Sequence, residues 1–119
     1  MSRWFCIFIW FFLIPLRAFG CDLALVLAVD VSGSVDSREY RIQMDGLAAA
    51  LRDGIVAEAL LSQEAMLTLV QWTGSSRQRQ TIPWARMASY ADLDAFATRV
   101  AEDPRVWRNF LTTFLGLRT

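Results

Sequence analysis

The pattern of apolar and polar residues divides the chain into a short series of strands and helices. Residues 23–29 form a continuous apolar run rich in β-favouring residues, which predicts a strand buried on both faces of a parallel sheet. Residues 36–53 and 89–103 carry apolar side chains at helical intervals, which predicts two amphipathic helices. Residues 65–72 and 79–84 are further β-rich runs and predict two more strands. The pattern therefore indicates an α/β domain.

The connections between these elements predict how the strands pair. A helix separates the first two strands, so these should lie parallel with a right-handed crossover. Residues 73–76 allow only a short turn, so the third strand should lie antiparallel to the second. Gly54 is expected to end the first helix, and residues 55–61 form a mostly apolar linker that can continue helically. Gln71 and Trp72 are a candidate ligand-facing pair, although Trp72 is more simply a core residue.

Oxygen-bearing side chains follow the first strand directly. Asp30 ends the apolar run, and Ser32, Gly33 and Ser34 form a polar turn before the first helix. In open α/β sheets, ligands bind at the carboxyl ends of the strands. One carboxylate and two hydroxyls are hard oxygen ligands with little charge, which suits Mg²⁺ or Mn²⁺. Gly33 is expected to let the backbone fold tightly between the two hydroxyls.

A purely structural alternative exists for the same residues. Asp30 can simply end the strand, while Ser34, Asp36 or Ser37 caps the following helix. We favour the metal interpretation because the motif comes straight after a buried strand and straight before an amphipathic helix.

The sequence Asp-Val-Ser-Gly-Ser after a strand resembles the metal-ion-dependent adhesion site (MIDAS) of von Willebrand factor type A (VWA) domains. The longer run over residues 21–36, together with Gln-Trp-Thr-Gly at 71–74, is similar to a family of secreted bacterial VWA-like proteins of unknown function. The match runs from about Cys21 to the C-terminus. It implies a Rossmann-like open sheet of VWA type, truncated here to the first three strands and two main helices.

The resemblance also extends to the last residues. Thr-Phe-Leu-Gly at 113–116 resembles the family's Thr-x-x-Gly, which implies that Thr113 is a fourth oxygen ligand beside Asp30, Ser32 and Ser34. The alternative is an ordinary helix-start threonine, and Thr112 competes for either role. The family's further strands, and the second acid that they bring to the metal, have no counterpart here. We therefore expect residues 21–119 to be a partial VWA-like domain whose first strand has an open edge.

Composition narrows the possible chemistry. The 119 residues allow one domain at most, and they contain no histidine, which excludes Ser-His-Asp and Cys-His nucleophilic sites and any His-ligated zinc within this chain. Without Arg3 and Arg17 of the N-terminal segment, ten basic residues stand against twelve acidic ones. A mildly acidic chain argues against nucleic acid as a partner.

Residues 1–20 are predicted to be a secretory signal peptide. Arg3 precedes an unbroken apolar run over residues 4–14, and residues 18–20 supply small side chains at the two positions that a signal peptidase reads. An uncleaved signal anchor is the alternative, so contact with a membrane is expected only through this segment. Cys6 would leave with the signal peptide, and Cys21 would then either pair with a cysteine absent from this chain or stay unpaired.

These observations predict an exported binding module, periplasmic or extracellular, rather than an enzyme. By the resemblance, Mg²⁺ (or Mn²⁺) would keep one open coordination position for a carboxylate of a protein ligand. One alternative is a phosphatase- or hydrolase-like enzyme with Asp30 as nucleophile, but Ser32 stands where such sites need a second acid, and no lysine or glycine-rich phosphate loop is present. The other alternative is a truncated fragment without a function of its own.

Overall fold

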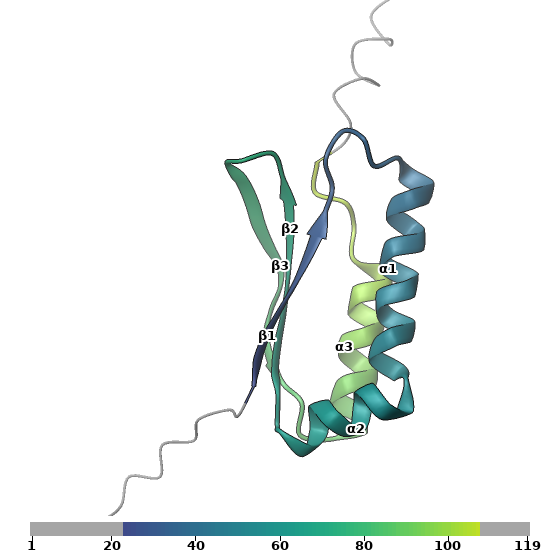
Figure 1. The fold of residues 1–119 in the computed structure, drawn as a ribbon, viewed down its shortest axis with the longest axis vertical. Coiled ribbons are helices and arrows are strands. Elements are labelled where there is room, and N and C mark those ends of the chain that lie inside the picture. The colour runs from purple at the N-terminus through teal and green to yellow at the C-terminus, as the bar shows by residue number, and fades with distance from the viewer. Residues whose placement is uncertain (1–22, 108–119) are drawn as a thin grey trace, which may run out of the picture.

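The computed structural model describes residues 23–107, in which three strands and three helices form a small α/β fold with one open sheet (Figure 1). The predicted fold class is thereby confirmed. The predicted signal peptide, Cys21 and Thr113 lie outside the described residues. In chain order the elements are β1 (Ala24–Asp30), α1 (Ser37–Arg52), α2 (Gly54–Ser62), β2 (Met66–Thr73), β3 (Arg77–Arg86) and α3 (Tyr90–Glu102).

The sheet has the strand order β1-β2-β3 and pairs as the connections predicted. β1 lies parallel to β2 in a register that runs from Ala24 opposite Met66 to Asp30 opposite Trp72. β2 and β3 form an antiparallel hairpin. β3 runs through Pro83 to Arg86, beyond the expected end at Trp84. Within residues 23–107 it lies at the edge of the sheet, and the register shifts near Pro83. A proline is tolerated at such a position because no ladder hydrogen bond is lost.

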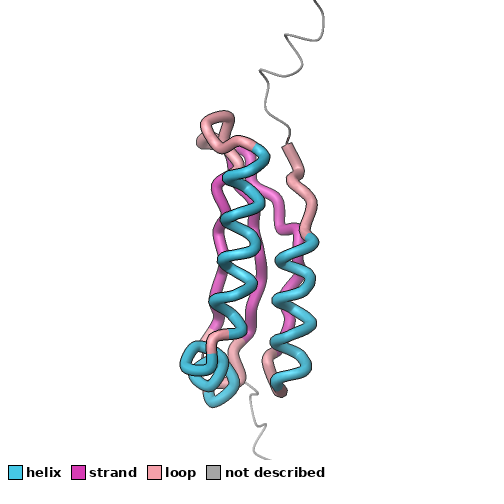
Figure 2. Tube along the Cα trace, turned by 90° about the vertical axis from the view of Figure 1, so that its right-hand side faces the viewer, coloured by secondary structure: helices cyan, strands magenta, loops and turns pink. Residues whose placement is uncertain are grey.

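α1 and α3 pack side by side against the same face of the sheet (Figure 2). Their apolar stripes meet the inward-facing residues of β2 and form the core. Its most deeply buried side chains include Met44, Leu51, Leu67, Leu69, Leu93, Phe96 and Val100. None of the helices within residues 23–107 has the length and apolar character needed to cross a membrane.

The expected end of the first helix needs a correction. Gly54 does not end it: α1 stops at Arg52, and Gly54 is instead the first residue of α2. The cause is Asp53, whose carboxylate accepts hydrogen bonds from the backbone N–H groups of Ile55 and Val56 and so caps a new helix. The apolar linker at 55–61 is therefore a helix in its own right.

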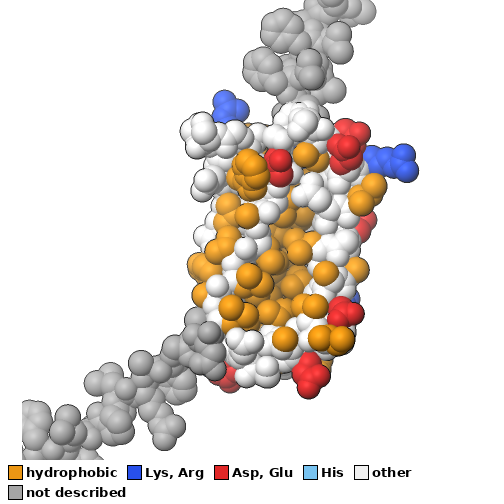
Figure 3. All heavy atoms as spheres, viewed as in Figure 1, with side chains coloured by type: hydrophobic (Ala, Val, Ile, Leu, Met, Phe, Trp, Pro, Cys, Tyr) orange, Lys and Arg blue, Asp and Glu red, His pale blue; other side chains and the backbone are white. Residues whose placement is uncertain are grey.

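Burial of β1 on both faces is a second prediction that the structure corrects. Val29 is buried, but Val26 is 49% exposed, and the inward-facing Leu25 and Leu27 are only half-buried. Within residues 23–107 the helices cover one face of the sheet, and β1 has no partner on its outer edge. Figure 3 shows apolar side chains gathered on this open side of the molecule, along β1 and between it and α1.

Trp72 is also placed differently from the expectation. Leu67, Leu69 and Gln71 are all fully buried and alternate along β2, whereas Trp72 is 37% exposed. Successive side chains of a strand point to opposite faces, so the position that faces the helices is that of Gln71. The polar residue of the pair, and not the aromatic one, is the core residue.

A candidate cation-binding loop

The residues predicted to bind a metal lie where β1 gives way to α1. Asp30 is the last residue of β1, and residues 31–36 form the connection to α1, which we call the 31–36 loop. The Val31 N–H donates to the Trp72 carbonyl over 2.9 Å, so the parallel pairing extends one residue into the loop. The loop therefore lies at the carboxyl end of the parallel strand pair, near the top of Figure 1.

Three of the four predicted ligands lie near one another at the end of β1 and in this loop. The Ser32 N–H donates to Asp30 Oδ1 over 2.7 Å, and the hydroxyl oxygens of Ser32 and Ser34 are 3.1 Å apart. With Mg–O distances of about 2.0–2.1 Å, neighbouring ligand oxygens of an octahedral shell are about 2.8–3.0 Å apart. The two hydroxyls thus stand at the separation of adjacent ligands, a distance that a hydrogen bond between them also explains.

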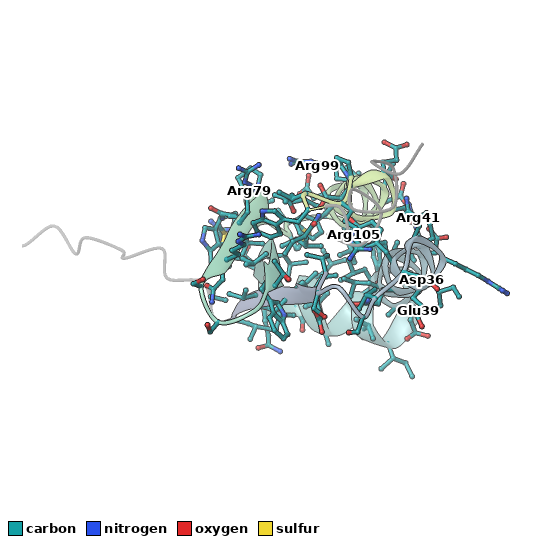
Figure 4. All side chains as sticks on the ribbon, turned by 90° about the horizontal axis from the view of Figure 1, so that it is seen from above. Asp36, Glu39, Arg41, Arg79, Arg99 and Arg105 are labelled. Carbon is teal, nitrogen blue, oxygen red and sulfur yellow. The ribbon has the colours of Figure 1, made fainter. Side chains whose placement is uncertain are left out.

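The helix-capping role belongs to a different residue of the loop. Asp36 Oδ1 accepts from the N–H groups of Arg38 and Glu39, each over 2.8 Å, while the Asp36 N–H donates to Glu39 Oε2 (Figure 4). This reciprocal pair is a complete capping box. Of the three capping candidates, Asp36 is the N-cap of α1, so the Ser34 hydroxyl is not used for capping.

Gly33 does not have the role that its position suggested. Its φ is not in the left-handed region, and a Cβ atom built on it would meet no atom within 4 Å. The expectation that a glycine is needed between the two hydroxyls is therefore wrong, because neither a strained backbone nor a close approach requires one.

Arg105, which lies just after α3, forms hydrogen bonds with the 31–36 loop. One of its terminal nitrogens, Nη1, donates to the Val35 carbonyl over 2.6 Å. The other, Nη2, donates to the carbonyls of Val31 and Ser32 over 2.8 and 2.9 Å. Figure 4 shows Arg105 between α3 and the start of α1. A single guanidinium thus binds three carbonyl groups of the loop.

Gln71 organises the segment that carries Arg105. Its Nε2 group donates to Asp103 Oδ2 over 2.8 Å and to the Pro104 carbonyl over 2.9 Å, and its Oε1 accepts from the Val106 N–H over 2.9 Å. Thr81 of β3 donates to the same Asp103 oxygen over 2.6 Å. A buried carboxamide therefore holds the backbone on both sides of Arg105.

Tyr40 completes this polar cluster on the side of α1. Its hydroxyl donates to the Asp103 carbonyl over 2.8 Å and receives a hydrogen bond from Gln71. Burial, and secondarily the charge of Asp103, raises the pKa of Tyr40 to about 12, so the hydroxyl keeps its proton at neutral pH. The Arg105 guanidinium carbon lies 6.0 Å from the centre of the Tyr40 ring, within reach of a cation–π contact.

Sequence reasoning missed Arg105 and assigned Gln71 the wrong surroundings. Both carry a signal that a reader of the sequence can use. Gln71 is a polar residue inside an apolar strand, and Arg105 follows Pro104 just beyond the amphipathic helix predicted at residues 89–103. Each is a buried or half-buried polar side chain, which must find hydrogen-bond partners.

The donor set fits a small divalent cation by its chemistry. Within residues 23–107, no three His, Cys, Asp or Glu side chains gather into a group that could hold a metal ion. Asp30, Ser32 and Ser34 are a different kind of set, with one carboxylate and two hydroxyls, as suits Mg²⁺ that retains water molecules. Thr113 lies outside the described residues, so its place beside them stays a prediction.

Comparison with known proteins yields a family but no described relative. A family model described as protein of unknown function (DUF1194) matches residues 20–116, which is most of the chain. The chain belongs to the DUF1194 family. No curated protein and no solved structure matches it. The matched range includes all the helices and strands described above and the residues of the candidate loop.

Proposed function

We propose that this DUF1194 protein is an exported VWA-like binding module that holds Mg²⁺ (or Mn²⁺) at the junction of β1 and its 31–36 loop. Asp30, Ser32, Ser34 and Thr113 would be the ligands. The partner would be a protein that offers a carboxylate to the metal, with no role for nucleic acid. The family match and the open α/β sheet support the VWA-like part of the proposal.

One observation carries the metal site. The Ser32 and Ser34 hydroxyls lie 3.1 Å apart directly after Asp30, at the end of a parallel strand. Asp36 caps α1, so Ser34 is left available for a ligand. The Asp30 carboxylate has a second oxygen besides the one that receives the Ser32 N–H, and that oxygen can face a cation directly or through water.

Each residue has a separate role in this proposal. Asp30 supplies the one negative charge, and the two serines supply neutral oxygens. These three ligands therefore neutralise only part of the cation's positive charge. When bound, the cation would supply an electrophilic position for a carboxylate of the partner. A negatively charged group from outside would complete the charge balance, so recognition should depend on the cation and on an acidic residue of the ligand.

Mn²⁺ binding to the full chain, followed by electron paramagnetic resonance, tests the site, with Mg²⁺ as competitor. Ser32→Ala and Ser34→Ala each remove one oxygen and should weaken binding by about tenfold or more. Asp30→Ala should abolish it because no other carboxylate belongs to the set. Ser37→Ala is the matched control: this serine is exposed at the start of α1, next to the loop.

Two results would contradict the proposal. Binding of Mn²⁺ that survives Asp30→Ala would place the metal elsewhere. Turnover of a phosphate ester that is lost in Asp30→Asn would indicate an enzyme with Asp30 as nucleophile instead of a binding module.

A further inference from the structure

The hydrogen bonds within the 31–36 loop leave most of its carbonyl groups without a partner in the loop. The Val35 N–H donates to the Ser32 carbonyl over 3.0 Å, and the Ser32 N–H donates to Asp30 Oδ1. These two bonds turn the chain but do not tie the loop to the body of the protein. Backbone carbonyls away from water need such partners, so the source of the remaining hydrogen bonds decides how well the loop is held.

Arg105 supplies hydrogen bonds to three carbonyls of the loop. Its guanidinium donates to the carbonyls of Val31, Ser32 and Val35, which stand on both sides of Ser34 along the chain. A guanidinium is flat and presents its donors in a fixed fork, so three carbonyls bound to it are held in a fixed relation to one another. The carbonyl of Ser32 belongs to the same residue as one candidate ligand oxygen.

Arg105 is itself held on both sides. The Gln71 carboxamide binds the Pro104 carbonyl and the Val106 N–H, and the Arg105 guanidinium lies near the Tyr40 ring. Gln71 is completely buried in β2, so its hydrogen bonds join the Arg105 segment to the core of the sheet. Gln71 thus binds the backbone at 104–106, and the Arg105 guanidinium of that segment binds the loop.

We propose that Arg105 is the positioning residue of the cation-binding loop: it binds no metal, but it holds the Ser32 and Ser34 hydroxyls at the spacing of two adjacent ligands. The inference rests on the proposed cation site. Outer residues that orient metal ligands commonly change metal affinity by about 10–100-fold when they are replaced.

Arg105→Lys in the full chain is the decisive variant. Lysine keeps the positive charge near the cation but cannot bind three carbonyls in one plane. We expect Mn²⁺ affinity to fall by about tenfold. We also expect hydrogen exchange, measured by nuclear magnetic resonance, to accelerate at the Ser32 and Val35 amides while the β2 amides keep their protection. Arg99→Lys is the matched control, because Arg99 is exposed on α3.

The two measurements separate the possible failures. Unchanged Mn²⁺ affinity and unchanged loop exchange in Arg105→Lys would overturn the positioning role. Exchange that accelerates equally in the loop and in β2, up to complete unfolding, would make Arg105 a general stabilising residue and would also overturn it. If the unsubstituted chain binds no Mn²⁺, the proposed function fails, and the contrast between loop and β2 exchange still decides whether Arg105 holds the loop.

Discussion

Buried polar side chains connect distant parts of this small protein at the residue scale. Gln71 comes from β2, Tyr40 from α1 and Thr81 from β3, and all of them bond to Asp103 just after α3. Each donor has an acceptor within 3.1 Å. Satisfied networks of this kind specify a single arrangement of the core, since an alternative packing would leave buried groups unpaired.

The free energy of unfolding should fall as the pH rises through the range in which Tyr40 titrates. Burial raises the pKa of Tyr40 from 10.0 to about 12, so the unfolded chain loses this proton first. The resulting stabilisation is complete below pH 10.0 and disappears as the pH approaches 12. Urea unfolding at a series of pH values should show this slope, and Tyr40→Phe should remove it.

The other tyrosine provides the control. Tyr90 is 65% exposed, and Tyr90→Phe should keep the alkaline slope. It also leaves Tyr40 as the single tyrosine of the chain, so the absorbance of tyrosinate then reports on Tyr40 alone. An alkaline slope that persists unchanged in Tyr40→Phe would show that another group is responsible.

Local rules account well for the individual elements. Three predicted strands and two predicted helices are present, and the parallel and antiparallel pairings are confirmed. The main error at this scale concerns the two glycines at turns and helix ends: Gly33 and Gly54 need no special conformation, whereas Gly74 of the β2–β3 hairpin has a φ of 60°. A glycine permits backbone conformations that other residues rarely adopt, but only its φ angle in the structure shows whether it adopts one.

Alanine substitutions at Gly74 and Gly33 should have different effects on stability. An alanine at Gly74 must adopt a left-handed conformation, so Gly74→Ala should lower the free energy of unfolding by about 1 kcal/mol. Gly33→Ala meets no atom within 4 Å and should change it by less than about 0.5 kcal/mol. Denaturant unfolding of the two variants measures both values. An equal loss at the two positions would contradict the backbone argument.

The whole molecule is a sheet covered by helices on one face, with β1 unpaired along its outer edge within residues 23–107. Val26, at the middle of β1, is 49% exposed. Apolar side chains gather on the open side of the molecule, along β1 (Figure 3). Exposed strand edges of this kind pair with other chains. The interpretation of the chain as a partial domain stays a prediction.

Self-association through β1 should therefore depend on Val26. We expect sedimentation velocity to show a concentration-dependent increase in mass, and Val26→Lys should reduce it because a lysine on an edge strand disfavours pairing. Ile42→Lys is the control, since Ile42 is 62% exposed but lies on α1. A monomer at every concentration, or an equal effect of Ile42→Lys, would contradict this prediction.

The sequence by itself determined the α/β class, the strand pairings and the position of Asp30, Ser32 and Ser34 at the end of a parallel strand. These follow from apolar periodicity and connection length, which are local properties. Only the tertiary structure decided that Gln71 faces inward and Trp72 outward, that β1 is half open, and that Arg105 holds a loop 70 or more positions earlier in the chain. Those features depend on which surfaces meet, and a contact between residues so far apart leaves no periodic pattern in the sequence.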